Sequence, residues 1–254
     1  MTAPFLTAAL PAPHGFFTRA GGVSAGRFAS LNCSLSGRDD ADAVRENRRR
    51  AADALGLPPG ALVGLTQVHG IAVATVETPW PETARPEADA MVTNRPGVLL
   101  GIVTGDCAPV LFADAEAGVV GAAHAGWRGA VAGVIEATLD AMEALGARRG
   151  RIAAAIGPCI GQQSYEVGPD LRDAVLARGA EDGRFFAPGA RPDRWLFDLP
   201  GYCAARLAAA GVARHGWIGR DTLAEEACFF SYRRATLGGG GPIGHQLSAI
   251  ACPG

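Results

Sequence analysis

The chain has 254 residues, a formal net charge of −2 and a hydrophobic content of 48%. This length suits one large domain or two small ones, and the composition is typical of globular rather than disordered proteins. The slight negative charge argues against a basic nucleic-acid surface, so we expect no nucleic-acid partner. All 23 basic residues are arginine. The absence of lysine excludes a Schiff-base enzyme, a pyridoxal-phosphate enzyme and a Walker A phosphate loop.

The first predicted elements are a helix and a series of short strands. The helix covers 42–56, where an Asp begins the segment, Gly56 ends it and Pro58 follows. Short apolar runs separated by Gly, Pro, Asp or Asn then predict strands at 62–68, 71–76, 89–92, 98–104, 108–113 and 117–123. A long helix is predicted at 127–145, because apolar residues recur at helical spacing and Gly146 ends the run.

The second half of the chain mixes helices and strands. Helices are predicted at 168–178 and 199–210, and strands at 212–218, 227–232 and 245–252. The segments 77–88, 179–194 and 238–241 are predicted loops. Since the order lacks a regular βαβ rhythm, we expect an α/β or α+β fold with a mixed sheet, rather than a TIM barrel or a Rossmann unit. No segment is typical of a linker, so we predict one domain over residues 1–254.

The cysteines and the N-terminal segment bear on the cellular compartment. The six cysteines are scattered and form no CxxC pair. Residues 1–13 lack a basic start and contain three prolines, unlike a secretory leader. No apolar run approaches the 18 or so residues of a membrane span. We therefore expect a cytoplasmic protein with free thiols and no membrane partner.

Three ligand-capable side chains lie next to glycine at predicted strand ends: His69, Cys107 and His124. Such positions hold reactive groups on a rigid scaffold while a ligand approaches. One thiolate and two neutral imidazoles form a sensible zinc set with an open fourth position. Two other interpretations stay open from the residues alone. His124 could activate Cys107 as a metal-free nucleophile, or all three could be buried core residues.

Two segments could bind anions. The segment after His124 leads directly into the helix predicted at 127–145, whose free N-terminal N–H groups favour an anion. Arg128 either adds a planar guanidinium for phosphate or carboxylate, or is an ordinary surface residue. Near the N-terminus, Arg19 and the glycine pair after it could cradle another anion or form an ordinary tight turn.

Several motifs in this order together resemble the laccase-domain family over nearly the whole chain. The family is also called multicopper polyphenol oxidase, peptidoglycan editing factor or purine nucleoside phosphorylase proteins. The motifs are HGFFTRAGGVS and SLN near the N-terminus, TQVHG, DAMVTNRPGVLLGIVTGDCAPVLFAD, GVVGAAHAGWRG, IGPCIG with YEVG, and CFFSYRR. The resemblance implies a single-domain layered sandwich of mixed β-sheets flanked by helices, distantly related to cysteine-dependent deamidase toxins. It also implies zinc at the positions of His69, Cys107 and His124, and a monomer or weak dimer.

The family names imply different chemistries, and the histidine count decides against one of them. A true four-copper laccase needs about ten histidines, usually in HxH pairs, as the laccases have. This chain has five histidines and no HxH pair, so we reject that interpretation. A single Cys/His/His site could still bind copper adventitiously and give weak polyphenol oxidase activity, because Cu²⁺ outcompetes Zn²⁺ at most such sites.

The resemblance favours zinc-dependent chemistry on purine nucleosides with phosphate. It implies phosphorolysis of adenosine, inosine and methylthioadenosine to the free base and ribose 1-phosphate, together with adenosine deaminase activity. The usual zinc-deaminase motif, H-x-E with P-C-x-x-C, is absent, so Asp106 or Glu166 is the candidate proton shuttle. Two alternatives remain. One is a Cys107–His124 amidase that edits a UDP-muramoyl-L-serine peptidoglycan precursor, and the other is a zinc-stabilised binding protein without catalysis.

These considerations predict a site with three kinds of residue. Catalysis is assigned to Cys107, His124 and Asp106, metal binding to His69, Cys107 and His124, and substrate or phosphate binding to Arg19, Arg128, Gln67 and Glu166. One departure from the family stands near the C-terminus. The family usually reads Gly-Arg-Gln where this chain has Gly244, His245 and Gln246, so any role of that arginine is in doubt here.

Overall fold

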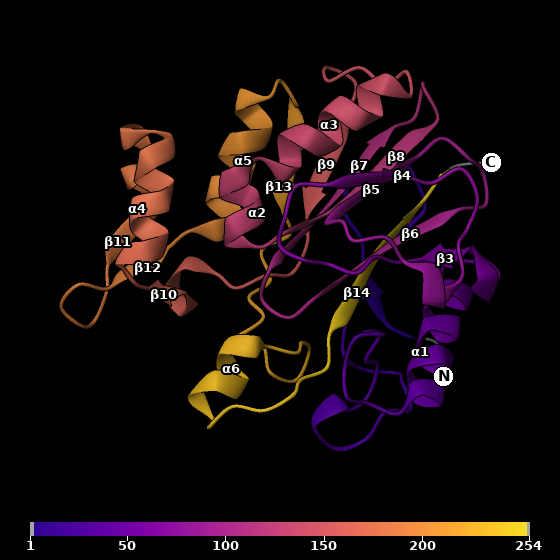
Figure 1. Cartoon of the computed structure of the whole chain (residues 1–254), viewed down its shortest axis with the longest axis horizontal. Helices are drawn as coiled ribbons and strands as arrows, with labels where there is room; N and C mark the ends of the chain where they lie inside the picture. The colour runs from indigo at the N-terminus through magenta and orange to yellow at the C-terminus, as the bar shows by residue number, and fades with distance from the viewer. Residues whose placement is uncertain (1–2, 253–254) are drawn as a thin grey trace.

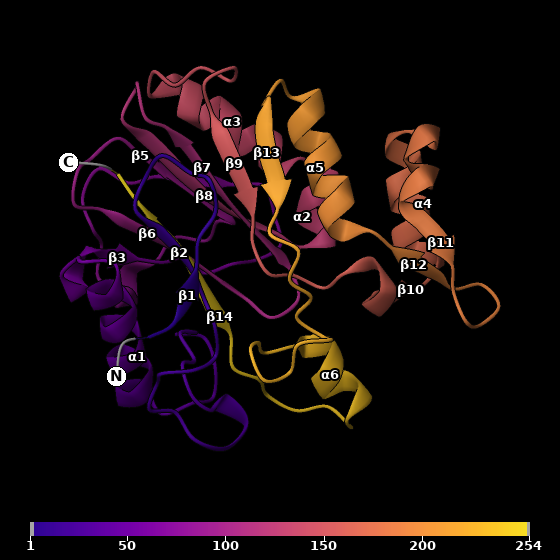
Figure 2. The ribbon, with the colours of Figure 1, turned by 180° about the vertical axis from the view of Figure 1, so that it is seen from behind.

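The computed structural model describes residues 3–252, which form two β-sheets packed face to face with helices on both outer sides. In Figures 1 and 2, α1 lies beside one sheet, and α2, α3 and α5 lie beside the other. This is a layered sandwich of mixed sheets and helices, as the sequence predicts. None of the helices within the described residues is long and apolar enough to cross a membrane.

A six-stranded sheet carries most of the candidate site. Its order is β13-β9-β7-β8-β5-β4. The strands are β4 (Val73–Thr75), β5 (Ala90–Thr93), β7 (Ala108–Asp114), β8 (Val119–Ala125), β9 (Ala153–Ile156) and β13 (Arg214–Trp217). The pairs β4/β5 and β9/β13 are parallel and the others are antiparallel. The two central strands, β7 and β8, are buried along their whole length, because other layers cover both faces of this sheet.

A five-stranded sheet covers the inner face of the first. Its order is β1-β2-β14-β6-β3, and only the β3/β6 pair is parallel. The strands are β1 (Phe5–Leu6), β2 (His14–Phe17), β3 (Leu62–Val63), β6 (Leu99–Thr104) and β14 (Gln246–Ala251). Side chains from both sheets, including Phe16, Ile102, Leu111 and Val120, form the apolar layer between them.

The helices close the two outer faces. They are α1 (Ala41–Ala54), α2 (Trp127–Ala132), α3 (Val134–Ala144), α4 (Pro169–Arg178), α5 (Leu199–Ala209) and α6 (Tyr232–Leu237). Short 3-10 turns occur at Gly26–Phe28, Pro59–Ala61, Glu82–Ala84, Gln162–Ser164 and Ala180–Phe185. Helices α3 and α5 bury their apolar faces on the six-stranded sheet, and α1 buries Ala51 and Ala52 against the five-stranded sheet. The core therefore consists of three apolar layers in a stack.

A small sheet and α4 project from one end of the sandwich. The strands are β10 (Glu166–Val167), β11 (Phe186–Pro188) and β12 (Trp195–Phe197), in the order β10-β12-β11. Figure 1 shows this part at the left, above α6. The rings of Phe186 and Phe197 stack within this sheet, and the contact of Phe197 with Tyr202 of α5 joins it to the main core.

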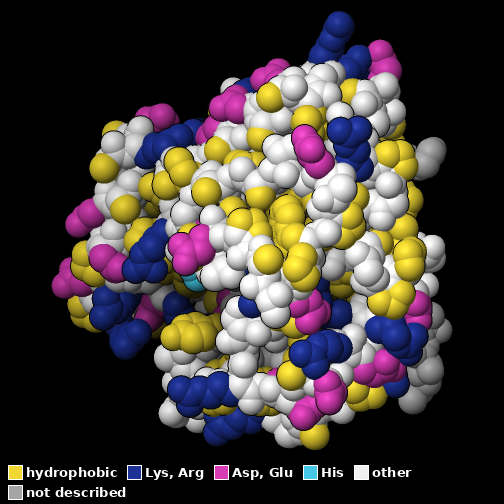
Figure 3. Space-filling view, turned by 45° about the vertical axis from the view of Figure 1, so that its right-hand side comes forward, with side chains coloured by type: hydrophobic (Ala, Val, Ile, Leu, Met, Phe, Trp, Pro, Cys, Tyr) yellow, Lys and Arg dark blue, Asp and Glu magenta, His cyan; other side chains and the backbone are white. Residues whose placement is uncertain are grey.

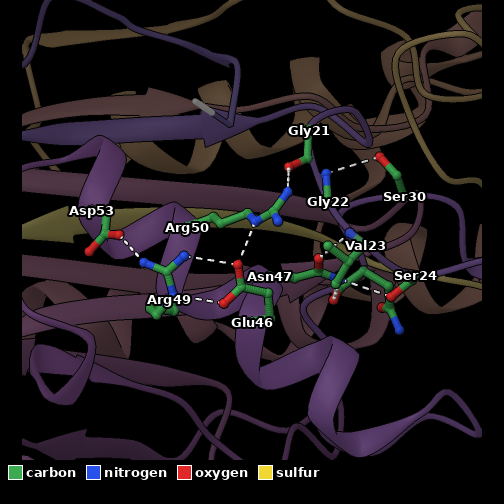
Figure 4. Close-up of polar contacts among 11 residues, drawn as sticks. Gly21, Gly22, Val23, Ser24, Ser30, Glu46, Asn47, Arg49, Arg50 and Asp53 are labelled. Atoms are coloured by element: carbon green, nitrogen blue, oxygen red, sulfur yellow. Dashed lines mark hydrogen bonds and ion pairs between the residues drawn. The ribbon is translucent and has the colours of Figure 1, made fainter. Parts of the chain in front are cut away.

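The glycine pair near the N-terminus forms a tight turn against α1, and Figure 4 shows its contacts. A Cβ on Gly22 would lie 2.1 Å from the carbonyl oxygen of Ser30, so only glycine fits there. The N–H of Gly22 donates to the Ser30 hydroxyl, and the N–H of Val23 donates to Oδ1 of Asn47 at 2.8 Å. The N–H groups of Gly22 and Val23 are therefore occupied by contacts within the protein.

Most predicted elements are present, with shifted ends. The helix predicted at 42–56 is α1, which begins after Asp40, whose carboxylate accepts a hydrogen bond from the N–H of Ala43. The strand predicted at 62–68 pairs only over β3. The strands expected at 71–76, 89–92, 98–104, 108–113 and 117–123 are β4 to β8. The helices expected at 168–178 and 199–210 are α4 and α5, and the strands expected at 212–218 and 245–252 are β13 and β14.

Three predictions of elements were wrong. The helix predicted at 127–145 is broken at Gly133, whose φ of 109° lies in the left-handed region, into α2 and α3. Residues 227–232 form no strand; a turn precedes α6, whose first turn is capped by the hydroxyl of Ser231. The loop predicted at 179–194 contains a 3-10 turn and β11. The strands β1, β2, β9, β10 and β12 and the helix α6 were not predicted.

Candidate functional site

Three side chains from distant parts of the chain meet at one end of the six-stranded sheet. His69 lies between β3 and β4, Cys107 directly precedes β7, and His124 is near the end of β8. One ligand atom from each of the three lies within 4.8 Å of the others. The Cys107 Sγ is 3.9 Å from Nε2 of His69, and the two imidazole rings meet edge to face at 4.7 Å. The structure thus brings together the three predicted metal ligands.

Unusual backbone positions make this convergence possible. His69 has a φ of 62° and Asp106 a φ of 94°, so two turns enter the left-handed region next to the cluster. Such conformations are uncommon for residues other than glycine and recur at functional sites. A Cβ on Gly126 would lie 2.9 Å from Cδ2 of His69 and 3.0 Å from the sulfur of Cys107. Glycine at 126 therefore leaves the room that the two ligands occupy.

Asp89 is a buried carboxylate that orders the cluster, and the sequence analysis did not single it out. Its Oδ1 lies 2.8 Å from Nδ1 of His124. The same carboxylate accepts the backbone N–H groups of Val68, His69 and Gly70 at 3.2, 2.9 and 2.6 Å. The bond to Nδ1 leaves Nε2 of His124 directed at the cluster, as metal-bound histidines require. One acid thus fixes the turn that carries the first histidine and the orientation of the second.

The electrostatics favour a thiolate at this site. Burial raises the pKa of Cys107, but the neighbouring imidazoles of His124 and His69 outweigh it, so the pKa is lowered. Burial lowers the pKa of His124, but Cys107 and Asp89 outweigh it and raise the pKa. Burial raises the pKa of Asp89, while its hydrogen bonds to His124 and to backbone N–H groups lower it. The metal-free cluster is therefore polarised toward thiolate and imidazolium.

The donor set fits a zinc ion. Zinc binds cysteine sulfur at about 2.3 Å and histidine nitrogen at about 2.0–2.1 Å in tetrahedral geometry, which separates ligand atoms by roughly 3.5 Å. The observed sulfur-to-nitrogen distance of 3.9 Å needs only a small adjustment. Within residues 3–252 this is the only group of three or more such donors, so the described chain offers ligands for one metal centre and not for a four-copper cluster.

The cluster lines a cavity of about 840 Å³, which is large enough for a small-molecule substrate. Trp127, Tyr165 and Tyr232 line its walls and offer flat apolar faces. Over the face shown in Figure 3, arginine and acidic side chains are interspersed, and a histidine side chain is visible in a recess. An aromatic pocket beside a polar cluster suits a flat heterocycle with polar edges.

The charge of the cavity wall differs from that of the whole chain. The lining arginines are Arg48, Arg85, Arg128, Arg191 and Arg233. Asp106 is the one acidic side chain among the lining residues that the structure describes, and hydrogen bonds from Thr222 and the N–H of Arg233 already occupy both of its carboxylate oxygens. The chain as a whole carries a formal charge of −2. Carboxylates next to the wall pair with two of these arginines, Glu166 with Arg191 and Glu82 with Arg48. The other three keep an excess of positive charge, which attracts anions.

Two of the four residues predicted to bind substrate or phosphate line the cavity. Arg128 is exposed there, with its guanidinium stacked 4.4 Å from the centre of the Trp127 ring. Gln67 also lines the cavity, but its side-chain amide forms two hydrogen bonds with the backbone of Val103 in β6. Its Nε2 donates to the carbonyl oxygen, and its Oε1 accepts from the N–H. Arg128 is therefore the freer of the two.

The structure does not bring the other two to the cavity wall. The guanidinium of Arg19 donates to the carbonyl oxygens of Ala29 and Glu226, which ties the N-terminal segment to the region before α6. The carboxylate of Glu166 pairs with Arg191. The anion site expected from a long helix is also reduced, because α2 has only six residues.

His245, where the family usually has arginine, does line the cavity. Burial lowers its pKa to about 4, and the charge of His124 adds to this effect, so the imidazole is neutral at physiological pH. Its Nδ1 is buried without a hydrogen-bond partner among the described residues. A neutral ring here supplies none of the charge that an arginine would bring.

Comparisons with known proteins identify the family of this chain. A family model described as multi-copper polyphenol oxidoreductase laccase matches residues 13–253. A protein of Deinococcus radiodurans named purine nucleoside phosphorylase is 45% identical over 100% of this chain and 96% of its own length. Another of that name from Pseudomonas aeruginosa is 44% identical over 87% of this chain and 88% of its own. The crystal structure of a Neisseria meningitidis protein superposes with a TM-score of 0.88, at 33% identity and with full coverage of both chains.

Proposed function

The chain belongs to the multi-copper polyphenol oxidoreductase laccase family, and from this premise we propose that it is a cytoplasmic purine nucleoside phosphorylase. The observation that carries the proposal is the meeting of His69, Cys107 and His124 in a cavity with aromatic walls and excess arginine. Relatives at 44–45% identity bear the name purine nucleoside phosphorylase. The six free cysteines suit a reducing compartment.

The proposed reaction breaks the bond between the sugar and the base. A phosphate oxygen forms a new bond to the anomeric carbon, and the bonding electron pair leaves with the purine, which gains a proton. The products are the free base and ribose 1-phosphate, with adenosine, inosine and methylthioadenosine as substrates. Trp127 and Tyr165 offer faces for the purine, and Arg128 offers a guanidinium for phosphate near the centre.

His69, Cys107 and His124 would hold the metal, and zinc suits this donor set best. A zinc ion in this position would supply Lewis-acid chemistry at its open fourth coordination site. Asp89 would hold His124 in the tautomer that presents Nε2. Copper binding at the same residues would be adventitious and would account for weak polyphenol oxidase activity.

Adenosine deaminase activity forms a second part of the proposal. Water would replace phosphate as nucleophile and attack the purine carbon that bears the amine, with ammonia as the leaving group. Asp106 is the nearer candidate for the proton shuttle, because it lines the cavity, whereas Glu166 does not line it and pairs with Arg191. Its two hydrogen bonds also make it a positioning residue for the turn before Cys107.

The test is base release from adenosine by the zinc-loaded protein, with and without inorganic phosphate. We expect adenine and ribose 1-phosphate only when phosphate is present, and loss of activity in Cys107→Ala and after chelation. Metal content by mass spectrometry should be about one zinc per chain in the wild type and none in the variant. Base release that ignores both phosphate and chelator would refute the proposal.

One observation favours a thiol amidase as the second candidate. The lowered pKa of Cys107 prepares a nucleophile in the metal-free protein, with His124 as its base. The proposed substrate class is a peptidoglycan precursor with a wrongly added L-serine on its UDP-muramoyl group. This candidate predicts phosphate-independent amide cleavage that iodoacetamide abolishes in the metal-free protein. Zinc binding that lowers activity would favour the amidase over the phosphorylase.

A further inference from the structure

A second group of arginines reaches the cavity from the side of α1. Arg48 projects from α1, and Arg85 belongs to the segment 77–88 that precedes β5; both line the cavity. Figures 1 and 2 show α1 and α2 on opposite sides of the two sheets. These arginines therefore approach the cavity from the side opposite α2, the helix that carries Arg128.

Arg48 is buried with incomplete pairing. Its side chain is 7% exposed. The guanidinium contacts the carbonyl oxygens of Cys33 and Leu62 at 3.4 Å each, and its Nε is 3.5 Å from Glu82. Hydrogen bonds of this type are usually near 2.9–3.0 Å, and a guanidinium has five N–H donors. A buried charge with three long contacts is stabilised when an anion supplies shorter ones.

Arg85 has even fewer contacts, although the chain on both sides of it is held in place. Within the described residues its side chain makes no hydrogen bond or ion pair, and its Nε is buried. Before it, Trp80 donates from Nε1 to the carbonyl oxygen of Gly64 at 2.9 Å. After it, the N–H of Thr66 donates to the carbonyl oxygen of Pro86 at 3.0 Å. The chain on both sides of Arg85 is thus anchored, while its guanidinium has no hydrogen-bond or ion-pair partner among the described residues.

Acidic side chains do not balance this end of the cavity. Glu82 is the one carboxylate paired there, and Arg45 and Arg48 share it at 3.5 Å each. Burial lowers the pKa of Arg48, and the charge of Arg85 acts in the same direction. Both arginines line the same cavity, and a doubly charged oxyanion bound to them would offset the repulsion between their charges.

We propose that Arg48 and Arg85 form an oxyanion subsite that binds a phosphate group within the substrate cavity. The group is either inorganic phosphate or the phosphate of a phosphorylated nucleoside. The inference rests on the proposed function for the identity of the nucleoside, and on the arginines alone for the anion. Planar guanidiniums match the oxygen edges of phosphate, and two of them suit its double charge.

The experiment measures binding and not turnover. Zinc-loaded full-length protein is titrated calorimetrically with inorganic phosphate, adenosine 5′-monophosphate and adenosine. Arg85→Gln is the deciding variant, because this side chain makes no hydrogen bond or ion pair among the described residues. Arg48→Gln is the second variant, with circular dichroism to confirm that it folds. Arg45→Gln is the matched control, since it shares α1 and Glu82 but is 59% exposed and does not line the cavity.

We expect both variants to weaken phosphate-group binding about 10-fold to 100-fold, with Arg45→Gln within about twofold of wild type. An effect on inorganic phosphate identifies the co-substrate as the ligand. An effect on adenosine 5′-monophosphate alone identifies a phosphate carried by the nucleoside. Equal affinities in the wild type and both variants for both probes would overturn the subsite, as would the absence of binding of either probe to the wild type.

Base release from adenosine is measured on the same samples to separate the two proposals. Arginine-dependent binding without base release contradicts the phosphorylase and leaves the subsite supported. Normal base release with equal probe affinities in all variants contradicts the subsite alone.

Discussion

Replacing Asp89 by asparagine tests whether one carboxylate organises the metal centre. The aspartate is fully buried and accepts four hydrogen bonds, three from backbone N–H groups and one involving His124. Asparagine has one acceptor oxygen, so its amide group must face at least one buried N–H. The new side chain nearly preserves volume, and the change therefore isolates the loss of charge and acceptors.

The magnitude follows from these contacts. An orphaned buried N–H costs about 1–3 kcal/mol, and the charge-assisted bond to His124 contributes about 1.5–3 kcal/mol. Because the effects overlap, we expect Asp89→Asn to lower the free energy of unfolding by about 2–4 kcal/mol. A domain with a stability of about 5–15 kcal/mol would remain folded. Zinc affinity should fall about 10-fold to 100-fold, since the carboxylate holds both the turn of His69 and the ring of His124.

The assay combines urea unfolding with zinc competition against a chelator at neutral pH. Asp114→Asn is the matched control, because Asp114 is equally buried and accepts the N–H groups of Glu116, Ala117 and Arg148 outside the cavity wall. It should lose stability and keep the wild-type zinc affinity. If Asp89→Asn folds and binds zinc as tightly as the wild type, the reasoning about its role is wrong.

Two further variants test the glycine at the cluster and the buried acid that serves as control. In Gly126→Ala the new Cβ would lie 2.9 Å from His69 and 3.0 Å from Cys107, so we expect zinc affinity at least 10-fold weaker in the competition assay. Gly216→Ala, where a Cβ meets open space, should change nothing, and equal losses in both variants would contradict the steric reasoning. Burial raises the pKa of Asp114, but its hydrogen bonds outweigh this and lower it. Its stabilisation is therefore fully present above the unfolded pKa near 4 and is lost as the pH falls through the lower folded pKa. Urea unfolding should thus show that Asp114→Asn is less stable than the wild type by about 1–3 kcal/mol at pH 7, with a smaller difference at pH 3. A stability difference that grows as the pH falls would show that the predicted direction of the pH dependence is wrong.

The three residues of the candidate metal centre could be singled out from the sequence because each is a local feature. His69, Cys107 and His124 are polar, lie at strand ends and have glycine nearby, and these signals can be read from a few neighbouring residues. The mixed sheet was likewise predictable from the irregular order of predicted strands and helices, whereas the layered arrangement was implied by the family resemblance. Asp89 has no such recognisable neighbourhood, because it is a single acidic residue before an ordinary strand. Its role arises only when the segment of His69 folds beside β5.

The arginines show the same limit more clearly. Arg19 and Arg128 each stand beside glycine in a suggestive motif, yet Arg19 binds backbone carbonyls and only Arg128 reaches the cavity. Arg48 lies within a run of three arginines on α1, where its neighbours Arg49 and Arg50 pair with Glu46, as Figure 4 shows. Which of the three arginines points inward depends on which face of α1 packs against the five-stranded sheet. That orientation is set by tertiary contacts and is not visible in the local sequence.

The errors in secondary structure have local physical causes that apolar periodicity hides. The 127–145 segment has a continuous apolar stripe, but Gly133 adopts a left-handed conformation that ends one helix and begins the next. The break changes the direction of the chain directly after the centre, and α2 therefore has too few aligned peptides for the strong N-terminal dipole that a long helix would supply.

Because the short helix α2 contributes little to anion binding, an anion in this cavity would depend on arginine side chains. This chain has 23 arginines and no lysine, and five of the arginines line the cavity. Glu166 pairs with Arg191 and Glu82 lies near Arg48, which leaves Arg85, Arg128 and Arg233 without a carboxylate partner among the described residues. A neutral substrate alone would leave this charge unbalanced, whereas a reaction that brings phosphate to a nucleoside would balance it. The same argument separates the family's names. Oxidation of a phenol at a single metal centre requires no anion site, and phosphorolysis requires one, so the cationic wall favours phosphate chemistry at the His69, Cys107 and His124 centre.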